Sequence, residues 1–192
     1  AVLRTASGVD HRGREVVFEF LIFPRNVHWE RNATDTLIVN KRRIEPNEAA
    51  NELFTGKIKQ RLDSAKSILV LASSANTTSQ TLAAQIAGKR AAMVAGWLAG
   101  IVPASIPIFE LNVGHYHTHC ARCDTNDITW RDALIVVMVR QKEWRASVGV
   151  ALKDAMAKPR NLPSPSRFSA FAIVRHTRNS AAGQDASSTG DK

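Results

Sequence analysis

The chain has 192 residues, of which 44% are hydrophobic, 22% charged and 6% aromatic. This is the composition of an ordinary globular domain with room for appendages. Its longest apolar runs, residues 68–72 and 133–139, are far shorter than the roughly 20 residues of a membrane-spanning helix, so we expect no transmembrane segment. Residues 1–13 also lack the basic start and the continuous apolar stretch of a secretory signal.

The net charge of +9 and the isoelectric point near 10.2 favour anionic partners. Basic residues outnumber acids by six to two in residues 51–100 and by seven to three in residues 151–192. Nucleic-acid-binding proteins usually combine such charge with aromatic platforms, but the basic residues of 57–66 have Phe54 as their one aromatic neighbour. We therefore interpret the charge mainly as a solvated helix face and keep nucleic-acid binding as the less favoured alternative.

The first strong strand signal is EVVFEFLIF at residues 15–23. Its β-branched and aromatic side chains favour a strand, and Pro24 ends it because proline lacks the N–H that a sheet requires. The sequence TLIV at 36–39 predicts a short edge strand.

The sequence IEPNEAANELF predicts the start of a helix, with Pro46 at the first helical position, where the missing N–H has no partner to lose. Apolar residues then recur every four positions as far as about Ala65, so one face of the helix is apolar, although Gly56 weakens it. The apolar positions are Ala50, Phe54, Ile58 and Leu62.

A buried strand and a long helix follow. The sequence SILVLAS at 67–73 is almost continuously apolar, which predicts an interior strand that is covered on both faces. Thr77 and Gln80 have the spacing of a capping box at the start of a helix. Gly100 and then Pro103 mark its end.

The remaining elements are predicted from shorter patterns. Strands are expected at 107–113 and 132–139, a short helix at 148–157 and a last strand at 168–174, whereas the polar tail 179–192 has almost nothing to bury and is expected to be disordered. The alternation of strands and helices predicts an α/β fold with a mixed or parallel sheet.

Arg90 is the most informative single residue. On a helical wheel it lies at the centre of an apolar stripe, and a buried guanidinium needs a partner because an isolated buried charge is very costly. Two interpretations remain open: a structural ion pair or snorkelling side chain, and a cation at the mouth of a pocket that awaits a ligand carboxylate. The stripe contains Leu82, Ile86, Met93, Val94, Trp97 and Leu98.

The stretch GKRAAMVAGWLAGIVPASI resembles the second-helix motif of OmpA-like domains, the periplasmic peptidoglycan-binding modules of outer-membrane proteins, lipoproteins and flagellar stator subunits. IEPNEAANEL resembles the start of the family's first helix, and RDALIVVMV resembles its closing strand. The matching positions are Ile44, Pro46, Leu53, Ile86, Arg90, Ala91, Val94, Trp97, Leu98, Gly100, Ile101, Gly114 and Arg131.

The resemblance implies an OmpA-like βαβαββ sandwich over residues 15–142, with a mixed sheet, helices packed on one face and an insertion at about 24–43. Residues 1–14 would then form an N-terminal arm. Residues 143–178 would form a C-terminal extension with a short helix and a strand. Such additions are common places for partner contacts.

The family's ligand clamp is incomplete in this sequence. In the family, an aspartate at the end of the second strand joins the helix arginine in holding the ammonium and carboxylate ends of diaminopimelate. Here that position is Ala75, beside Asn76, and the motif's Asn and Ser correspond to Ala83 and Ala87. An arginine alone can pair with a carboxylate but cannot recognise an ammonium group. The resemblance thus implies a peptidoglycan or anion site at Arg90, Asn76 and Ala75 in which wall binding is weak or lost.

The expected function follows from this resemblance and from missing catalytic motifs. Neither a nucleophile elbow nor a phosphate-binding glycine loop occurs in the sequence, so we expect no enzyme. We expect a structural component of an envelope-spanning assembly such as a secretion or conjugation system, located in the periplasm at the outer membrane, with other envelope proteins as partners. A genuine peptidoglycan anchor is the alternative, and a basic nucleic-acid-binding module is the alternative from another class.

The sequence GHYHTHCARCD places His115, His117 and His119 at alternate positions, followed by Cys120 and Cys123. These residue types suit tetrahedral zinc, although structural zinc sites generally draw their ligands from two separated pairs. A disulfide is favoured over zinc in an oxidising compartment. A redox-active dithiol and free thiols are the remaining alternatives. We expect no cofactor, with zinc as the less favoured alternative.

Overall fold

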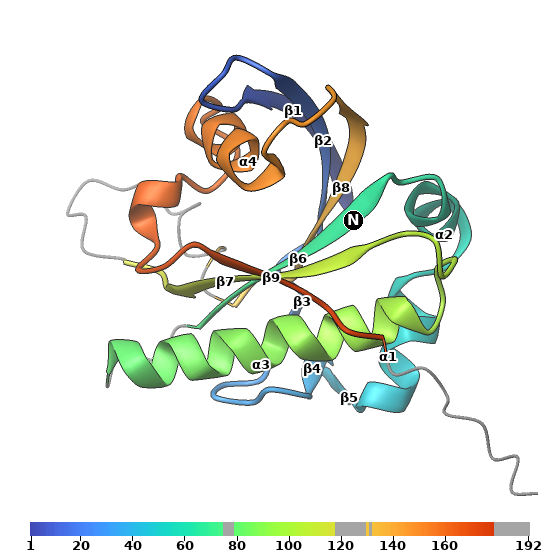
Figure 1. The fold of residues 1–192 in the computed structure, drawn as a ribbon. Helices are drawn as coiled ribbons and strands as arrows, with labels where there is room; N and C mark the ends of the chain where they lie inside the picture. The colour runs from blue at the N-terminus through green and yellow to red at the C-terminus, as the bar shows by residue number, and fades with distance from the viewer. Residues whose placement is uncertain (75–78, 118–129, 131, 179–192) are drawn as a thin grey trace, which may run out of the picture.

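The computed structural model describes residues 1–74, 79–117, 130 and 132–178 (Figure 1). The strands of its main sheet are β1 (Val2–Val9), β2 (Glu15–Ile22), β6 (Ser67–Ser74), β7 (Ile108–His115), β8 (Ile135–Lys142) and β9 (Ala172–Arg175). Their order is β1-β2-β8-β6-β7-β9. Strands β6 and β7 are parallel, and the four other neighbouring pairs are antiparallel. The predicted α/β class with a mixed sheet is confirmed.

The two central strands are buried on both faces. In β6, Ile68 and Val70 belong to one hydrophobic core, whereas Leu69 and Leu71 belong to a second core on the opposite face. Strand β8 has the same alternation. The continuous apolar run at 67–73 therefore correctly predicts an interior strand, because side chains of a strand point alternately to both faces.

Three helices cover the first face: α1 (Pro46–Leu53), α2 (Gly56–Asp63) and α3 (Gln80–Ala99). The expected single helix from Pro46 to Ala65 is wrong, because Gly56 has a φ of 55° and the helical path breaks there. Helix α3 begins after Ser79, whose side chain accepts a hydrogen bond from the Leu82 N–H. Thr77, expected in that capping role, lies outside the described residues.

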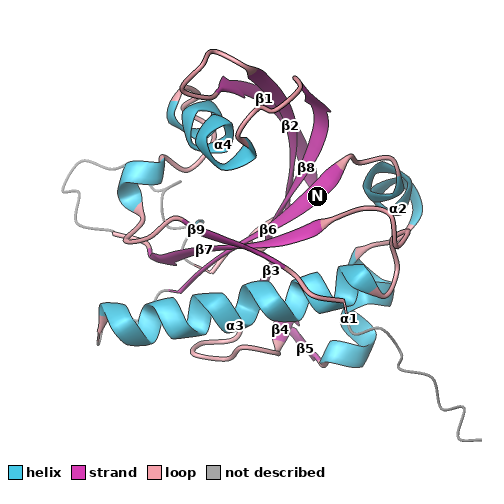
Figure 2. Cartoon of the chain, viewed as in Figure 1, coloured by secondary structure: helices cyan, strands magenta, loops and turns pink. Residues whose placement is uncertain are grey.

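The opposite face carries α4 (Val148–Ala157), which has the predicted bounds and packs mainly against β1 and β2 (Figure 2). Helices thus lie on both faces of the sheet, and the expectation of helices on one face holds only for α1 to α3. Residues 1–14, expected as an arm, contain β1, which pairs with β2 along all eight of its residues. The sequence of β1, VLRTASGV, does not alternate between apolar and polar residues, so it carries no strand signal of the kind that a half-buried strand gives.

The insertion at about 24–43 forms a second sheet. It consists of β3 (Val27–Trp29), β4 (Leu37–Val39) and β5 (Arg42–Ile44), paired antiparallel in that order. Strand β4, expected at an edge, is the central strand. A bridge between His28 and Ala133 joins the insertion to the main sheet, and Trp29 packs in the same core as α3. The insertion is therefore an integral part of the first face.

The C-terminal extension adds the edge strand β9, which pairs with β7 and begins four residues later than the predicted start at 168. Phe168 instead packs its ring against Tyr116, after the short 3-10 helix η2 (Pro165–Arg167). Within the described residues, no helix combines the length and the apolar character needed to cross a bilayer.

Candidate functional site

Arg90 lies in the middle of α3 and its side chain is fully buried, with 0% exposure. Its guanidinium donates four hydrogen bonds. Nε binds the Ala33 carbonyl at 2.8 Å, and Nη2 binds the Glu30 carbonyl at 3.2 Å. Nη1 binds both the Ser73 carbonyl at 2.9 Å and the Asp132 carboxylate at 2.7 Å. The chain itself therefore supplies the partner that a buried cation needs.

The charge of Arg90 is balanced inside the protein. Burial lowers the pKa of the guanidinium, and the hydrogen bond and charge of Asp132 act in the opposite direction. Arginine nevertheless keeps its proton in proteins, so the pair is ionic. The Trp29 ring adds a cation–π contact, with its centroid 5.2 Å from Arg90 Cζ. Of the two interpretations that the sequence leaves open, this geometry is that of the internal ion pair.

The insertion covers the Arg90 guanidinium, whereas the side chain of Asp132 remains 29% exposed. Glu30 and Ala33 belong to the loop between β3 and β4, and their carbonyls face the guanidinium. Trp29 in β3 stacks on Trp97 of α3, with ring centroids 6.1 Å apart, and its backbone N–H binds the Asp132 carbonyl at 3.2 Å. The loop is thus fixed to α3 and to the start of β8 around the ion pair.

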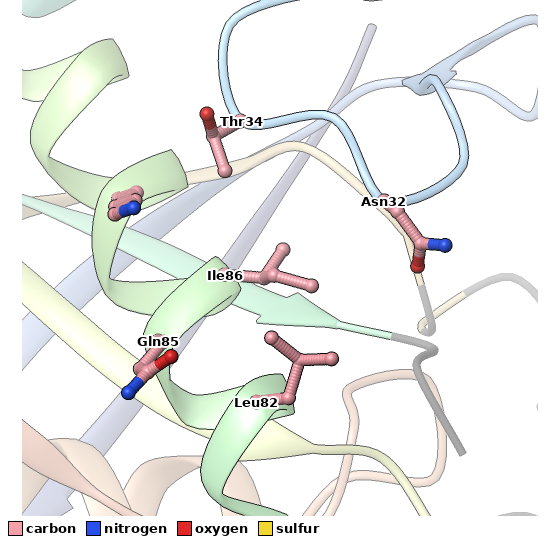
Figure 3. A pocket seen from close by; sticks show the side chains of 6 residues that line it. Asn32, Thr34, Leu82, Gln85 and Ile86 are labelled. Atoms are coloured by element: carbon pink, nitrogen blue, oxygen red, sulfur yellow. The ribbon is translucent and has the colours of Figure 1, made fainter. Parts of the chain in front are cut away.

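A small pocket of about 280 Å³ lies on the outer side of the same loop. Figure 3 shows Asn32 and Thr34 on the loop, facing Leu82 and Ile86 on the first turns of α3. Its lining residues are Asn32, Thr34, Leu82, Gln85, Ile86 and Lys89. Lys89 is the one charged side chain among them, so the pocket resembles a shallow amphipathic surface more than a clamp for a zwitterion.

The other predicted site residues are only partly described. Ala75 and Asn76 lie outside the described residues, as do His119, Cys120 and Cys123. His115 ends β7, and its ring lies 5.4 Å from the ring of His117 in an edge-to-face arrangement. The part of the chain that the structure describes contains no group of three or more His, Cys, Asp or Glu side chains suited to a metal ion. The zinc and disulfide interpretations therefore stay predictions.

Sequence reasoning missed Asp132. The resemblance places the acidic partner of Arg90 at Ala75, at the end of the second predicted strand, whereas the actual partner lies three residues before β8 and 42 residues after the arginine. A usable signal existed in the sequence, because an acid stands directly before an apolar strand that is predicted to be central. The two loop carbonyls carried no such signal, since any residue type supplies a backbone carbonyl.

Comparison with known proteins found no matching family model, no matching curated protein and no matching solved structure.

Proposed function

We propose that the protein is a non-enzymatic structural component of a bacterial cell envelope, built on a degenerate OmpA-like domain. We place it in the periplasm at the outer membrane, as part of an envelope-spanning assembly such as a secretion or conjugation system. One observation carries the proposal: the chain's own carboxylate and backbone carbonyls occupy the Arg90 guanidinium, which in a wall-binding domain would hold the ligand.

The arrangement of strands supports the OmpA-like assignment. Strands β2, β6, β7 and β8 correspond to the four strands that the resemblance implies, and they are adjacent in the order β2-β8-β6-β7. Helix α3 connects the parallel strands β6 and β7, and α1 to α3 share one face. The arginine of the motif also lies inside the stripe of α3 that faces this core.

The state of Arg90 supports a scaffold role over wall anchoring. A ligand carboxylate would have to displace Asp132 and the loop carbonyls of Glu30 and Ala33 before it met the guanidinium. Each displaced group would then need another partner, because an unsatisfied buried polar group costs about 1–3 kcal/mol. The additional elements β1, β3 to β5, α4 and β9 enlarge the surface on which partner proteins can bind.

Co-sedimentation with purified peptidoglycan tests the proposal. We expect weak, non-saturable binding that is equal in the wild type, in the pocket variant Lys89→Gln and in the remote control Lys57→Gln, which removes the same charge from α2. Saturable binding that Lys89→Gln or a folded Arg90→Lys variant abolishes would instead identify a wall anchor. Fractionation of cells that express the protein should recover it in the periplasmic and outer-membrane fractions.

A further inference from the structure

Two turns at one end of the sheet form a single rigid surface, distant from α3 and the Arg90 pair (Figure 1). Residues 10–14 connect β1 to β2, and residues 142–147 include the end of β8 and the turn toward α4. The Asp10 carboxylate joins them: it accepts two backbone N–H groups of its own turn at 2.9 and 3.0 Å, and the N–H of Ser147 at 3.0 Å. The Arg14 guanidinium also donates to a carbonyl of the second turn at 2.8 Å. We call these two segments the basic tip.

The basic tip presents the most exposed aromatic side chain of the described residues. Trp144 is 78% exposed, whereas Trp29 and Trp97 are buried and Trp130 is partly buried. The guanidinium of Arg145 lies 4.1 Å from the Trp144 ring centroid. A tryptophan in this position adds little to the core, so its large apolar area is available for a contact outside the chain.

The basic tip carries four cations and two acids, so its net charge is positive. Asp10 accepts backbone N–H groups as described, and the Glu143 carboxylate accepts the N–H of Glu15. Two further acids lie beside the tip: Glu15, whose residue is exposed, and Asp154, which accepts the N–H of Val9 and pairs with Lys158. The cations of the tip are Arg12, Arg14, Lys142 and Arg145.

We propose that the basic tip docks on an anionic phospholipid surface, with the Trp144 ring at the lipid–water interface and the cations against the headgroup phosphates. Tryptophan favours this interface because its ring is apolar and its N–H is polar, and each Lys or Arg near an anionic leaflet adds about 1 kcal/mol, or about fivefold in affinity. The net charge of +9 acts in the same direction.

Single-stranded nucleic acid fits the tip less well. Such binders stack successive bases on several aromatic side chains, whereas Trp144 is the one aromatic residue among the exposed large hydrophobic side chains of the described part of the chain. The docking surface is independent of the proposed function, since it uses neither Arg90 nor the pocket beside it.

Vesicle flotation with the full chain tests this inference. We expect binding to vesicles of phosphatidylcholine with phosphatidylglycerol, little binding to pure phosphatidylcholine, and a decrease in binding as salt is added. Trp144→Ala should lower the partition coefficient about tenfold through loss of the buried ring area. The double variant Arg12→Gln with Arg145→Gln should lower it about 25-fold.

Two matched controls separate docking from folding and from total charge. Leu82→Ala removes an exposed apolar side chain from α3, and Lys57→Gln removes a charge from α2, so neither should change docking on vesicles by more than about twofold if the tip is the contact. Because Trp144 is exposed, the Trp144→Ala variant should keep the wild-type urea midpoint. Absent binding to anionic vesicles, or binding unchanged by Trp144→Ala, overturns the proposal. Binding to a thymidine oligonucleotide but not to vesicles would identify a nucleic-acid surface instead.

Discussion

Arg90 draws its partners from three parts of the chain: the β3–β4 loop, the end of β6 and the residue before the last central strand. A side chain with such partners holds together segments that are far apart in the sequence. Replacing only one member of a buried ion pair leaves an uncompensated group, which is why breaking a pair costs more than the pair contributes.

Arg90→Met should therefore destabilise the protein by about 3–5 kcal/mol. The Asp132 carboxylate and the backbone carbonyls that now accept hydrogen bonds from the Arg90 guanidinium would lose their donor. Urea unfolding followed by circular dichroism measures the effect. The neighbouring variant Lys89→Met, at an exposed position, should change the free energy of unfolding by less than about 0.5 kcal/mol. A gain of stability in Arg90→Met would indicate that the charge is kept for an external ligand.

Asp10 gives the basic tip a dependence on pH. Backbone N–H groups of Arg14 and Ser147 donate to its carboxylate and hold its pKa below the ordinary value of 3.8. Because the pKa is lower in the folded than in the unfolded state, the ionised group contributes stability above about pH 4, and this contribution is lost as the pH falls through the folded-state pKa.

Asp10→Asn should consequently flatten the acid side of the stability curve. Thermal melting midpoints measured between about pH 6 and about pH 2 should fall less steeply in this variant than in the wild type. If the melting midpoints of the two proteins fell in parallel as the pH is lowered, protonation of Asp10 would not contribute to the loss of stability in acid.

Among the elements, α4 and β1 are in unusually close contact. At Gly8 in β1, an added Cβ would lie 1.9 Å from the Ala151 carbonyl oxygen and 2.6 Å from the Ala155 nitrogen, both in the backbone of α4. Backbone atoms cannot rotate away as a flexible side chain can. The packing of the helix on this edge strand therefore requires glycine at that position.

Two glycine substitutions should have opposite effects. Gly8→Ala should destabilise the protein by at least about 2 kcal/mol, because α4 must move away from β1. Gly96→Ala should stabilise it by about 0.5–1 kcal/mol, since Gly96 lies inside α3 with nothing within 4 Å of the added methyl group. Differential scanning calorimetry of both variants measures the two signs, and equal effects would contradict the close contact of β1 and α4.

At the scale of the whole molecule, two hydrophobic cores lie on opposite faces of one sheet. The first contains the two buried tryptophans, Trp29 and Trp97, and the second contains Met156 of α4. The central strands contribute alternate side chains to both. Loss of either core exposes one face of the same strands, so we expect the cores to unfold together.

Met156→Ala should test this cooperativity, because it removes a fully buried side chain from the second core and should cost about 2–5 kcal/mol. Met156→Ala and its parent are both measured in a Trp130→Phe, Trp144→Phe background, which leaves only the two tryptophans of the first core. Their fluorescence and the far-ultraviolet circular dichroism should shift to the same lower urea midpoint. A fluorescence transition that stays at the wild-type midpoint would show that the two faces unfold independently.

The elements with a strong local sequence pattern could be predicted from the sequence. The continuous run at 67–73, the helix at 148–157 and the inward position of Arg90 were all evident from periodicity. The mixed sheet followed from the alternation of elements. Features that depend on tertiary contacts were not predicted.

Those unpredicted features have physical reasons. Strand β1 has no clear alternation, since its exposed residues include Val2, Leu3 and Val9 as well as polar ones. Strands β3 and β5 have three residues each, which is below the length at which alternation can be recognised. The partners of Arg90 were missed because two of them are backbone carbonyls of the insertion loop, and the acid, Asp132, precedes the central strand β8, 42 residues after Arg90. Such contacts become visible only when the chain is folded.

The β3–β4 loop limits how a ligand-binding site at Arg90 could be restored. Because it is tethered beside Arg90, it competes with any diffusing carboxylate at an effective concentration in at least the millimolar range. Introducing an acid at Ala75 alone would thus leave all four internal hydrogen bonds of the Arg90 guanidinium in place. Both the loop carbonyls and the Asp132 carboxylate have to be removed first, so the order of the changes decides whether a wall-binding domain can be recovered from this scaffold.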